Sequence, residues 1–371
     1  MASMALGGSA AAAAPRVTCG STVTTNVTLT ADLRCPHGNG ITLGSNVILD
    51  LGGHKLIGGG YAGVGVQTSP DSLGGNTIRN GTIKNWATGL LLQAQDGKPY
   101  TVSRVALRTA PVQHYYGNTT LNLTKVTAVD SRIEGQEGSD LAISHSRLTR
   151  SPVNVFFASA TITGSTLVQS TLDTSARGEI VVDSSYLNGK GTSALGAVSE
   201  TRLTIRNSVV RNYAEPVTGF WGAVTFTNSR FSDMPNGVLG DISYNIPDFD
   251  ATSDIVGNRF IRSGVALRGD VPMIVENNTF TQNEIGVDFT RTPFPGEPPL
   301  TAEGSRAVGN VLTKNTGTGI QTDLSGLAVG SNTAQRNGGY GIYAPGAIDL
   351  GGNVAFRNTL GQCVGVVCTT R

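Results

Sequence analysis

Charged residues and long apolar runs are both scarce in this chain. Only 14% of the 371 residues are Asp, Glu, Lys or Arg, and the net charge is +1. A nucleic-acid-binding protein would carry a strongly basic surface, which this balance does not favour. No apolar run approaches the ~18 residues that span a bilayer. The sequence therefore predicts neither a nucleic-acid partner nor a membrane span.

Helical periodicity is missing as well. Apolar residues do not recur at helical spacing over any useful length, which argues against amphipathic helices. Glycine is abundant instead, at 49 residues. Gly and Asn tolerate the left-handed backbone of tight turns, so this composition indicates an all-β fold with many turns.

An asparagine repeat organises the second half of the chain. Its steps are 21, 30, 20, 32, 22 and 21 residues, which indicates a period near 21 with two enlarged turns. In residues 121–210, serine takes this position after short alternating strands. The repeating asparagines are Asn207, Asn228, Asn258, Asn278, Asn310, Asn332 and Asn353, and the serines are Ser131, Ser146, Ser165, Ser185 and Ser208. The repeat predicts one elongated solenoid of 13 to 15 coils, in which each coil buries its apolar face against its neighbours.

The two ends of the chain carry all four cysteines. Cys19 and Cys35 lie near the start, and Cys363 and Cys368 lie near the end. Two local disulfides would clamp the ends of a solenoid and would indicate an oxidising, extracellular compartment. A zinc site is the alternative, although the spacing is not that of metal ligands. Residues 1–16 resemble the end of a secretory signal or a disordered tail, so we expect one domain over 17–371, with caps at 17–45 and 355–371.

The segment that begins at Cys35 carries a family resemblance. It reads C-P-H-G-N-G-I-T-L, followed by N-V-I-L-D-L-G-G-H-K-L. This segment resembles the opening coils of secreted right-handed parallel β-helix proteins of the pectate-lyase-like superfamily. The resemblance implies a single-stranded right-handed parallel β-helix and an extracellular polysaccharide as substrate. The superfamily contains lyases, hydrolases, epimerases, esterases and adhesins, and the signature motifs of polygalacturonases, of the main pectate lyases and of mannuronan epimerases are absent here.

Four insertions fall at the same phase of the repeat. They cover residues 67–75, 93–100, 243–254 and 290–305. Because insertions at one phase share one edge of a solenoid, they should rim a groove along one flank. The plain coils between the second and third insertions would form an open floor that suits a polymer.

Histidine, tyrosine and arginine gather in the coils that would form this floor. His114 and Tyr116 could act as base and acid in β-elimination from a uronic acid, with Arg147 as the cation that acidifies the C5 proton. Tyr115, Arg132, His145, Arg150 and Arg291 are the residues that we expect to bind substrate. The alternative interpretation is that these are ordinary packed or solvated surface groups.

Carboxylates suggest two further sites. Asp248, Asp250 and Asp254 lie within seven residues and could hold Ca²⁺, or form a solvated acidic loop. Asp241 and Asp288 occur in equivalent strands two coils apart, and such a pair could serve inverting glycoside hydrolysis. Two unrelated exposed strand residues are the simpler interpretation.

The sequence thus favours an extracellular lyase that cleaves an acidic polysaccharide by β-elimination. The alternatives are a non-catalytic carbohydrate-binding β-helix and a glycoside hydrolase or transferase that uses paired aspartates. Ca²⁺ is the one cofactor indicated, and the oligomeric state is left open.

Overall fold

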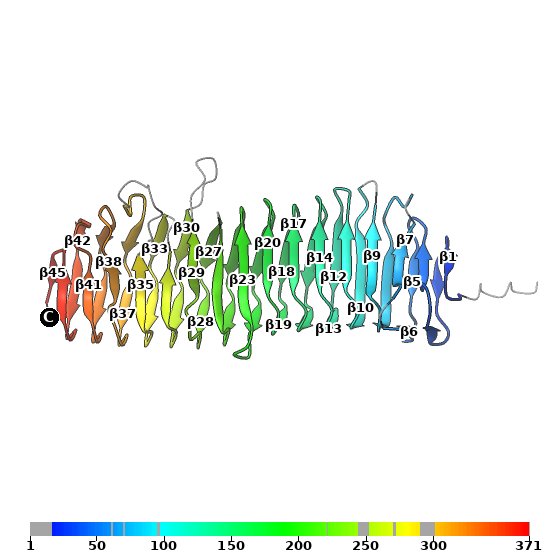
Figure 1. Cartoon of the computed structure of the whole chain (residues 1–371), viewed down its shortest axis with the longest axis horizontal. Helices are drawn as coiled ribbons and strands as arrows, with labels where there is room; N and C mark the ends of the chain where they lie inside the picture. The colour runs from blue at the N-terminus through cyan, green and yellow to red at the C-terminus, as the bar shows by residue number, and fades with distance from the viewer. Residues whose placement is uncertain are drawn as a thin grey trace, which may run out of the picture.

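The computed structural model describes residues 17–60, 62–69, 71–94, 97–220, 222–243, 252–269, 272–289 and 301–370. These residues form a long stack of parallel strands, with the N-terminal coils at one end and the C-terminal coils at the other (Figure 1). Strands and turns account for all of the regular structure in the described ranges, which contain no helix. The predicted all-β solenoid is confirmed, and one of its sheets alone contains 16 strands.

The 16-stranded sheet, called sheet A here, contributes one strand to each coil. Its strands are β1 (Ser21–Val23), β4 (Ile41–Leu43), β7 (Val64–Thr68), β9 (Thr88–Gln93), β11 (Val112–Tyr115), β14 (Ile133–Gln136), β17 (Val153–Phe156), β20 (Leu172–Ser175), β23 (Ala194–Ser199), β26 (Glu215–Phe220), β29 (Leu239–Ser243), β32 (Val265–Arg268), β35 (Ile285–Phe289), β38 (Ile320–Thr322), β41 (Tyr340–Tyr343) and β44 (Gly361–Val364).

The remaining strands form two further faces of the stack, and β8 and β10 run through both of them. The face that follows sheet A contains β2 (Val27–Thr28), β5 (Ile48–Asp50), β8 (Thr77–Lys84), β10 (Tyr100–Arg108), β12 (Thr120–Thr124), β15 (Asp140–Ser144), β18 (Ser159–Thr163), β21 (Glu179–Asp183), β24 (Arg202–Arg206), β27 (Ala223–Thr227), β30 (Ser253–Val256), β33 (Met273–Glu276), β36 (Arg306–Val308), β39 (Ala328–Gly330) and β42 (Ile348–Gly351).

The third face then leads back to sheet A. It contains β3 (Leu33–Cys35), β6 (Lys55–Gly58), β13 (Thr127–Val129), β16 (Arg147–Thr149), β19 (Thr166–Val168), β22 (Tyr186–Asn188), β25 (Val209–Arg211), β28 (Arg230–Ser232), β31 (Arg259–Ile261), β34 (Thr279–Thr281), β37 (Val311–Thr313), β40 (Thr333–Gln335), β43 (Asn353–Phe356) and β45 (Cys368–Thr369).

A continuous apolar core fills the space between the three faces. Strand residues alternate between inside and outside, so one apolar residue in two points inward. In-register pairing then stacks like on like: Ile133 pairs with Val153, and Val153 with Leu172. Toward the C-terminus, the rings of Phe231, Phe260 and Phe280 stack with centroids 5.2 and 4.8 Å apart.

Two ladders of small polar side chains run along the corners of the stack. The first ladder lies between the second and third faces and contains Ser146, Ser165, Ser185, Ser208, Ser229, Asn258, Asn278, Asn310, Asn332 and Asn353. The second ladder lies before sheet A and contains Ser131, Ser151, Ser170, Ser263, Asn283, Asn315, Asn337 and Asn358. In each ladder, a side-chain oxygen accepts a hydrogen bond from a buried backbone N–H of the preceding coil.

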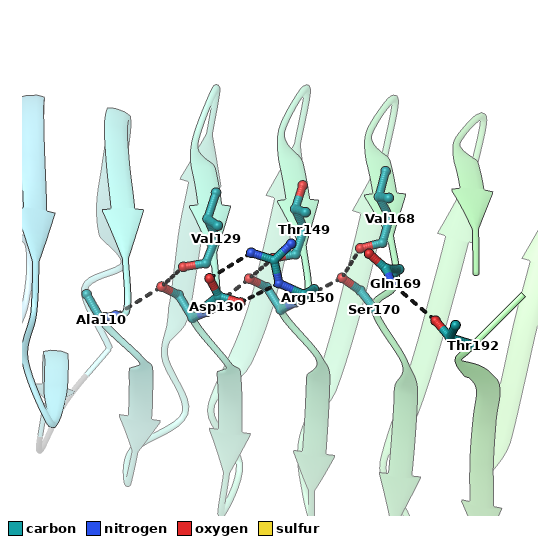
Figure 2. A network of polar contacts seen from close by, with 11 residues as sticks. Ala110, Val129, Asp130, Thr149, Arg150, Val168, Gln169, Ser170 and Thr192 are labelled. Carbon is teal, nitrogen blue, oxygen red and sulfur yellow. Dashed lines mark hydrogen bonds and ion pairs between the residues drawn. The ribbon is translucent and has the colours of Figure 1, made fainter. Parts of the chain in front are cut away.

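Figure 2 shows the serine part of the second ladder. The backbone N–H of Ser131 donates to the Ser151 hydroxyl at 3.1 Å, and that of Ser151 donates to the Ser170 hydroxyl at 3.0 Å. The Ser131 hydroxyl in turn donates to the Val129 carbonyl at 2.9 Å. Each of these serines therefore gives a buried backbone N–H of the preceding coil an acceptor, as buried peptide groups require.

The ladders correct part of the predicted repeat. Asn207 and Asn228 are not ladder residues; they precede Ser208 and Ser229 and adopt left-handed backbone with φ of 51° and 48°. Asparagine tolerates this conformation better than most residues, which explains its presence there. Ser131 belongs to the second ladder, not to the same corner as the other predicted serines.

Both predicted disulfides form. Cys19 pairs with Cys35 near the first coil, and Cys363 pairs with Cys368 in the last coil. The described ranges contain no apolar helix of membrane-spanning length. Residues 1–16 lie outside the described residues, so the proposed signal remnant or tail stays a prediction, as do the exact limits of the two caps.

We predict that Asn310→Ala lowers the free energy of unfolding by about 2–3 kcal/mol, because buried partners are left without a hydrogen bond. The Asn310 oxygen accepts from the Asn278 backbone N–H at 3.0 Å, and its amide donates to the Val275 carbonyl at 2.8 Å. Asn310→Ser is the matched control and should lose less, because serine fills this position in the N-terminal half. Denaturant unfolding measures both variants, and equal stability of Asn310→Ala and the unaltered chain would contradict the role of the ladder.

Candidate functional site

A groove of about 460 Å³ crosses the outer face of sheet A over β14, β17, β20 and β23. In-register pairing makes its floor regular, because every second residue of each strand points outward and lines up with the same position on the next strand. One row contains Glu134, Asn154, Asp173 and Ala197. The adjacent row contains Gln136, Phe156, Ser175 and Ser199.

Glu134 and Asp173 are the two carboxylates of the groove. Glu134 pairs with Asn154 and Asn154 with Asp173, so the carboxylate-bearing residues lie two strands apart. Two strand spacings place their backbones ~10 Å from each other. Inverting glycosidases hold their two carboxyl groups about 6.5–9.5 Å apart, so a backbone separation of two strands is comparable with that arrangement.

The surroundings of these two carboxylates differ. Arg132 Nε lies 2.9 Å from one oxygen of Glu134, and the Gln113 amide donates to the other at 3.3 Å. Around Asp173, burial raises the pKa above its ordinary value, and hydrogen bonds from the Thr171 hydroxyl and the Ala197 backbone only partly offset it. Two carboxylates whose environments separate them in this way are suited to different roles in acid–base chemistry.

Aromatic side chains lie beside the carboxylate row. Phe156 is 45% exposed and Phe157 is 51% exposed, and their rings meet edge to face with centroids 4.6 Å apart. Tyr115 and Tyr116 lie two strands away at the end of β11, and Tyr116 is 56% exposed. Exposed rings next to a polar groove are the surfaces on which sugar rings stack.

The four predicted insertions start at one edge of the stack. Each begins at or beside the last residues of a strand of sheet A, namely β7, β9, β29 and β35. The groove lies on the sheet A strands between the second and third of these positions. The predicted location of the floor therefore agrees with the structure, although the residues that form it differ from those expected.

His114 is a core residue. Its side chain is fully buried on β11, with Nδ1 3.1 Å from the Leu92 carbonyl and Nε2 3.1 Å from the Thr119 hydroxyl. Burial lowers its pKa, so the neutral imidazole is favoured. This placement does not support the predicted role as a base, because both nitrogens are engaged inside the protein and out of reach of a polymer.

Three other predicted residues do lie at or near the groove. Tyr115 points outward in the same row as Gln136, and burial raises the pKa of its phenol. Tyr116 is exposed at the turn that follows, with left-handed backbone at φ 54°. Arg132 reaches the groove through its ion pair with Glu134.

His145, Arg147 and Arg150 belong to other parts of the surface. His145 is exposed at the corner that follows β15, and Arg147 is exposed on β16 in the third face. Arg150 forms a two-point ion pair with Asp130, with N–O distances of 2.6 and 2.8 Å (Figure 2). The structure therefore does not bring these three residues together with Tyr115 and Tyr116 around one substrate.

Asp241 and Asp288 are not level in the backbone register, and because the side chain of Asp241 lies outside what the structure describes, their carboxylate pair stays a prediction. Leu239 pairs with Leu267, and Leu267 with Val287, so the residue level with Asp288 is Gly240. A register shift between β26 and β29 accompanies this offset. Asp288 itself is buried against Arg268, whose guanidinium lies 3.2 Å from its carboxylate, and burial raises its pKa.

The predicted metal site can be followed only in part. Asp254 begins the next face on β30, 4.0 Å from the Arg202 guanidinium. Asp248 and Asp250 lie outside the described residues, as does Arg291. Within the ranges that the structure describes, no cluster of three His, Cys, Asp or Glu side chains could hold a metal. A Ca²⁺ site in this loop stays a prediction.

Sequence reasoning missed most of the groove floor. Glu134, Asn154 and Asp173 are separated by 20 and 19 residues, which matches the repeat. This spacing indicates that the three residues occupy equivalent positions in successive coils. The short alternating strands that precede the repeating serines in residues 121–210, such as β15 and β21, belong to the second face. Alignment on sheet A would have placed the three polar residues in one row.

The chain can be compared with curated proteins, with solved structures and with a family model. No curated protein matches the chain in sequence. Among solved structures, the catalytic unit of a thermostable GH87 α-1,3-glucanase from Streptomyces thermodiastaticus strain HF3-3 is similar at 11% identity and a TM-score of 0.39, over 95% of this chain and 63% of that one. The catalytic domain of a GH87 α-1,3-glucanase variant in complex with tetrasaccharides gives 12% identity and a TM-score of 0.31, over 91% and 64%.

A third similar structure is the A-module of a mannuronan C-5 epimerase from Azotobacter vinelandii. It gives 13% identity and a TM-score of 0.26, over 94% of this chain and 91% of that one. The present chain spans just under two thirds of the length of the glucanase chains. The family model described as "Right handed beta helix region" matches residues 173–359, which is just over half of the sequence. The chain belongs to this right-handed β-helix family.

Proposed function

We propose that this protein is an extracellular glycoside hydrolase that cleaves a polysaccharide bound across sheet A. The observation that carries the proposal is the presence of two carboxylates, Glu134 and Asp173, in one groove, with the pKa of Asp173 raised by burial. Exposed aromatic rings beside that pair supply surfaces for sugar stacking. The two disulfides support an oxidising compartment outside the cell.

The roles of the two carboxylates follow from their surroundings. Asp173, whose pKa is raised by burial, is suited to hold a proton and to give it to the glycosidic oxygen as that bond to C1 breaks. Glu134, held by Arg132, is suited to take a proton from a water whose oxygen forms the new bond to C1. The separation of about two strands leaves room for that water, so the product should have inverted anomeric configuration.

The β-elimination expected from the sequence has less support in the groove. A uronate substrate would bring its carboxylate toward Glu134, whose negative charge repels it. The neighbouring guanidinium, Arg132, is already engaged by Glu134. We therefore propose a neutral or weakly charged polysaccharide as the substrate class.

The decisive assay measures new reducing ends on a panel of polysaccharides that includes α-1,3-glucan, β-1,3-glucan, xylan, pectate and alginate. We expect reducing ends from a neutral member and expect Glu134→Gln and Asp173→Asn each to lower kcat by about 10²–10⁴-fold. Glu137→Gln is the matched control, because Glu137 is an exposed carboxylate at the turn after β14 and outside the carboxylate row.

Other outcomes of the assay would support a different function or mechanism. Ultraviolet absorbance from an unsaturated uronate product, without hydrolysis, would establish the lyase instead. Full activity in both carboxylate variants would exclude the assigned mechanism. Binding without any turnover would favour a carbohydrate-binding module. A chelator that leaves the rate unchanged would remove the Ca²⁺ proposed for the loop before Asp254.

The pH profile gives a separate prediction. Because the acid must be protonated, kcat/KM should fall as the pH rises through the pKa of Asp173, which burial raises above its ordinary value. The native state should also lose stability over the same interval, since it binds the Asp173 proton more tightly than the unfolded chain. Asp173→Asn should remove this slope from the unfolding curve, whereas a slope that persists in the variant would assign it to another group.

A further inference from the structure

Asn154 occupies the centre of the groove. It lies on β17 and pairs in register with Glu134 on one side and with Asp173 on the other. Phe156, two residues further along the same strand, exposes its ring on the same face. A sugar positioned between the two carboxylates would therefore lie over the Asn154 side chain.

The side-chain oxygen of Asn154 is buried and has no hydrogen-bond partner among the described residues. Its two neighbours in the row differ in this respect. Glu134 is held by Arg132 and Gln113, and Asp173 accepts from Thr171. An unpaired buried acceptor is costly, and among the described residues Asn76 and Asp288 carry the other two such side-chain oxygens, both outside the groove.

We infer that Asn154 is a substrate-binding residue whose side-chain oxygen accepts a hydrogen bond from a sugar hydroxyl. This inference rests on the proposed function and deepens it. Glu134, the carboxylate on one side, is an acceptor as well, so this part of the row suits a ligand rich in hydrogen-bond donors. Hydroxyl groups meet that requirement, whereas the carboxylate of a uronic acid or a sulfate ester at this position would not.

Stability distinguishes binding from a structural role. If Asn154 holds the fold together, Asn154→Ala and Asn154→Leu should lower the thermal midpoint. If its oxygen is kept for a ligand, removing an unpaired polar group should leave the midpoint unchanged or raise it.

The experiment combines that readout with binding. Calorimetric titration with neutral glucan, xylan and mannan hexasaccharides should show affinity about 10-fold or more weaker for both variants, with the midpoint unchanged or higher. Gln321→Ala is the control, since Gln321 carries an amide on the outer face of sheet A, level with Asp288 and away from the groove. Its affinity should equal that of the unaltered protein.

Two results would overturn the inference. One is unaltered affinity in the Asn154 variants, and the other is a lower thermal midpoint with affinity retained by the folded fraction. Failure of the unaltered protein to bind any of the hexasaccharides would count against this inference and the proposed function together. If Glu134→Gln keeps full turnover while Asn154→Ala loses binding, the hydrolytic mechanism fails and the assignment of Asn154 stands.

Discussion

The structure depends on satisfying buried backbone groups at the corners of its coils. A chain that turns inside a stack leaves N–H groups facing the next coil, where water cannot reach them. Serine or asparagine at a fixed corner position supplies the missing acceptor, as Ser151 does for Ser131 and Asn310 does for Asn278. Because the acceptor must recur at the same place in each coil, the ladders also fix the register of neighbouring strands.

Fixed register is what makes a flat functional surface possible on sheet A. A slip of one residue between adjacent strands would turn every outward side chain inward. With the register held from β14 to β20, Glu134, Asn154 and Asp173 form a row, and Phe156 lies in the row beside it. The chemistry proposed for the groove is therefore a consequence of corner hydrogen bonds that lie away from the groove floor.

The sequence predicts the fold well because the repeating residues each meet a physical requirement of the coil. Asn278, Asn310 and Asn332 recur because the buried amide is needed, and the cysteines lie at the two ends that need clamping. Asn207 and Asn228 resemble ladder residues in the sequence, but they occupy the position before the ladder. Asparagine also suits that position because its backbone is left-handed.

The candidate site is harder to read because function depends on which face of a short strand a residue occupies. His114 follows Val112 by two residues, and Val112 is buried, so simple alternation places the imidazole inside. Asp241 lies one residue out of register with Asp288, and an offset of this kind between β29 and β35 is invisible in residue spacing. Burial of Asp173 and its effect on the pKa also depend on neighbouring coils, not on local sequence.

The contrast between the ladders and the groove is itself evidence of function. Along the corners, side chains such as Asn258, Asn278 and Asn310 both donate and accept hydrogen bonds. In the groove, the chain keeps a carboxylic acid whose pKa is raised by burial and, next to it, a buried amide oxygen without a partner. Because the ladders pair their polar groups so regularly, neither the raised pKa nor the unpaired oxygen is a necessary consequence of the repeat. Native proteins retain such local violations mainly where a site needs them, and these two lie on adjacent strands of one groove. Asp288 on β35 also combines a raised pKa with an unpaired carboxylate oxygen, so it is the position of Asp173 and Asn154 beside the exposed ring of Phe156 that favours a chemical role for the groove.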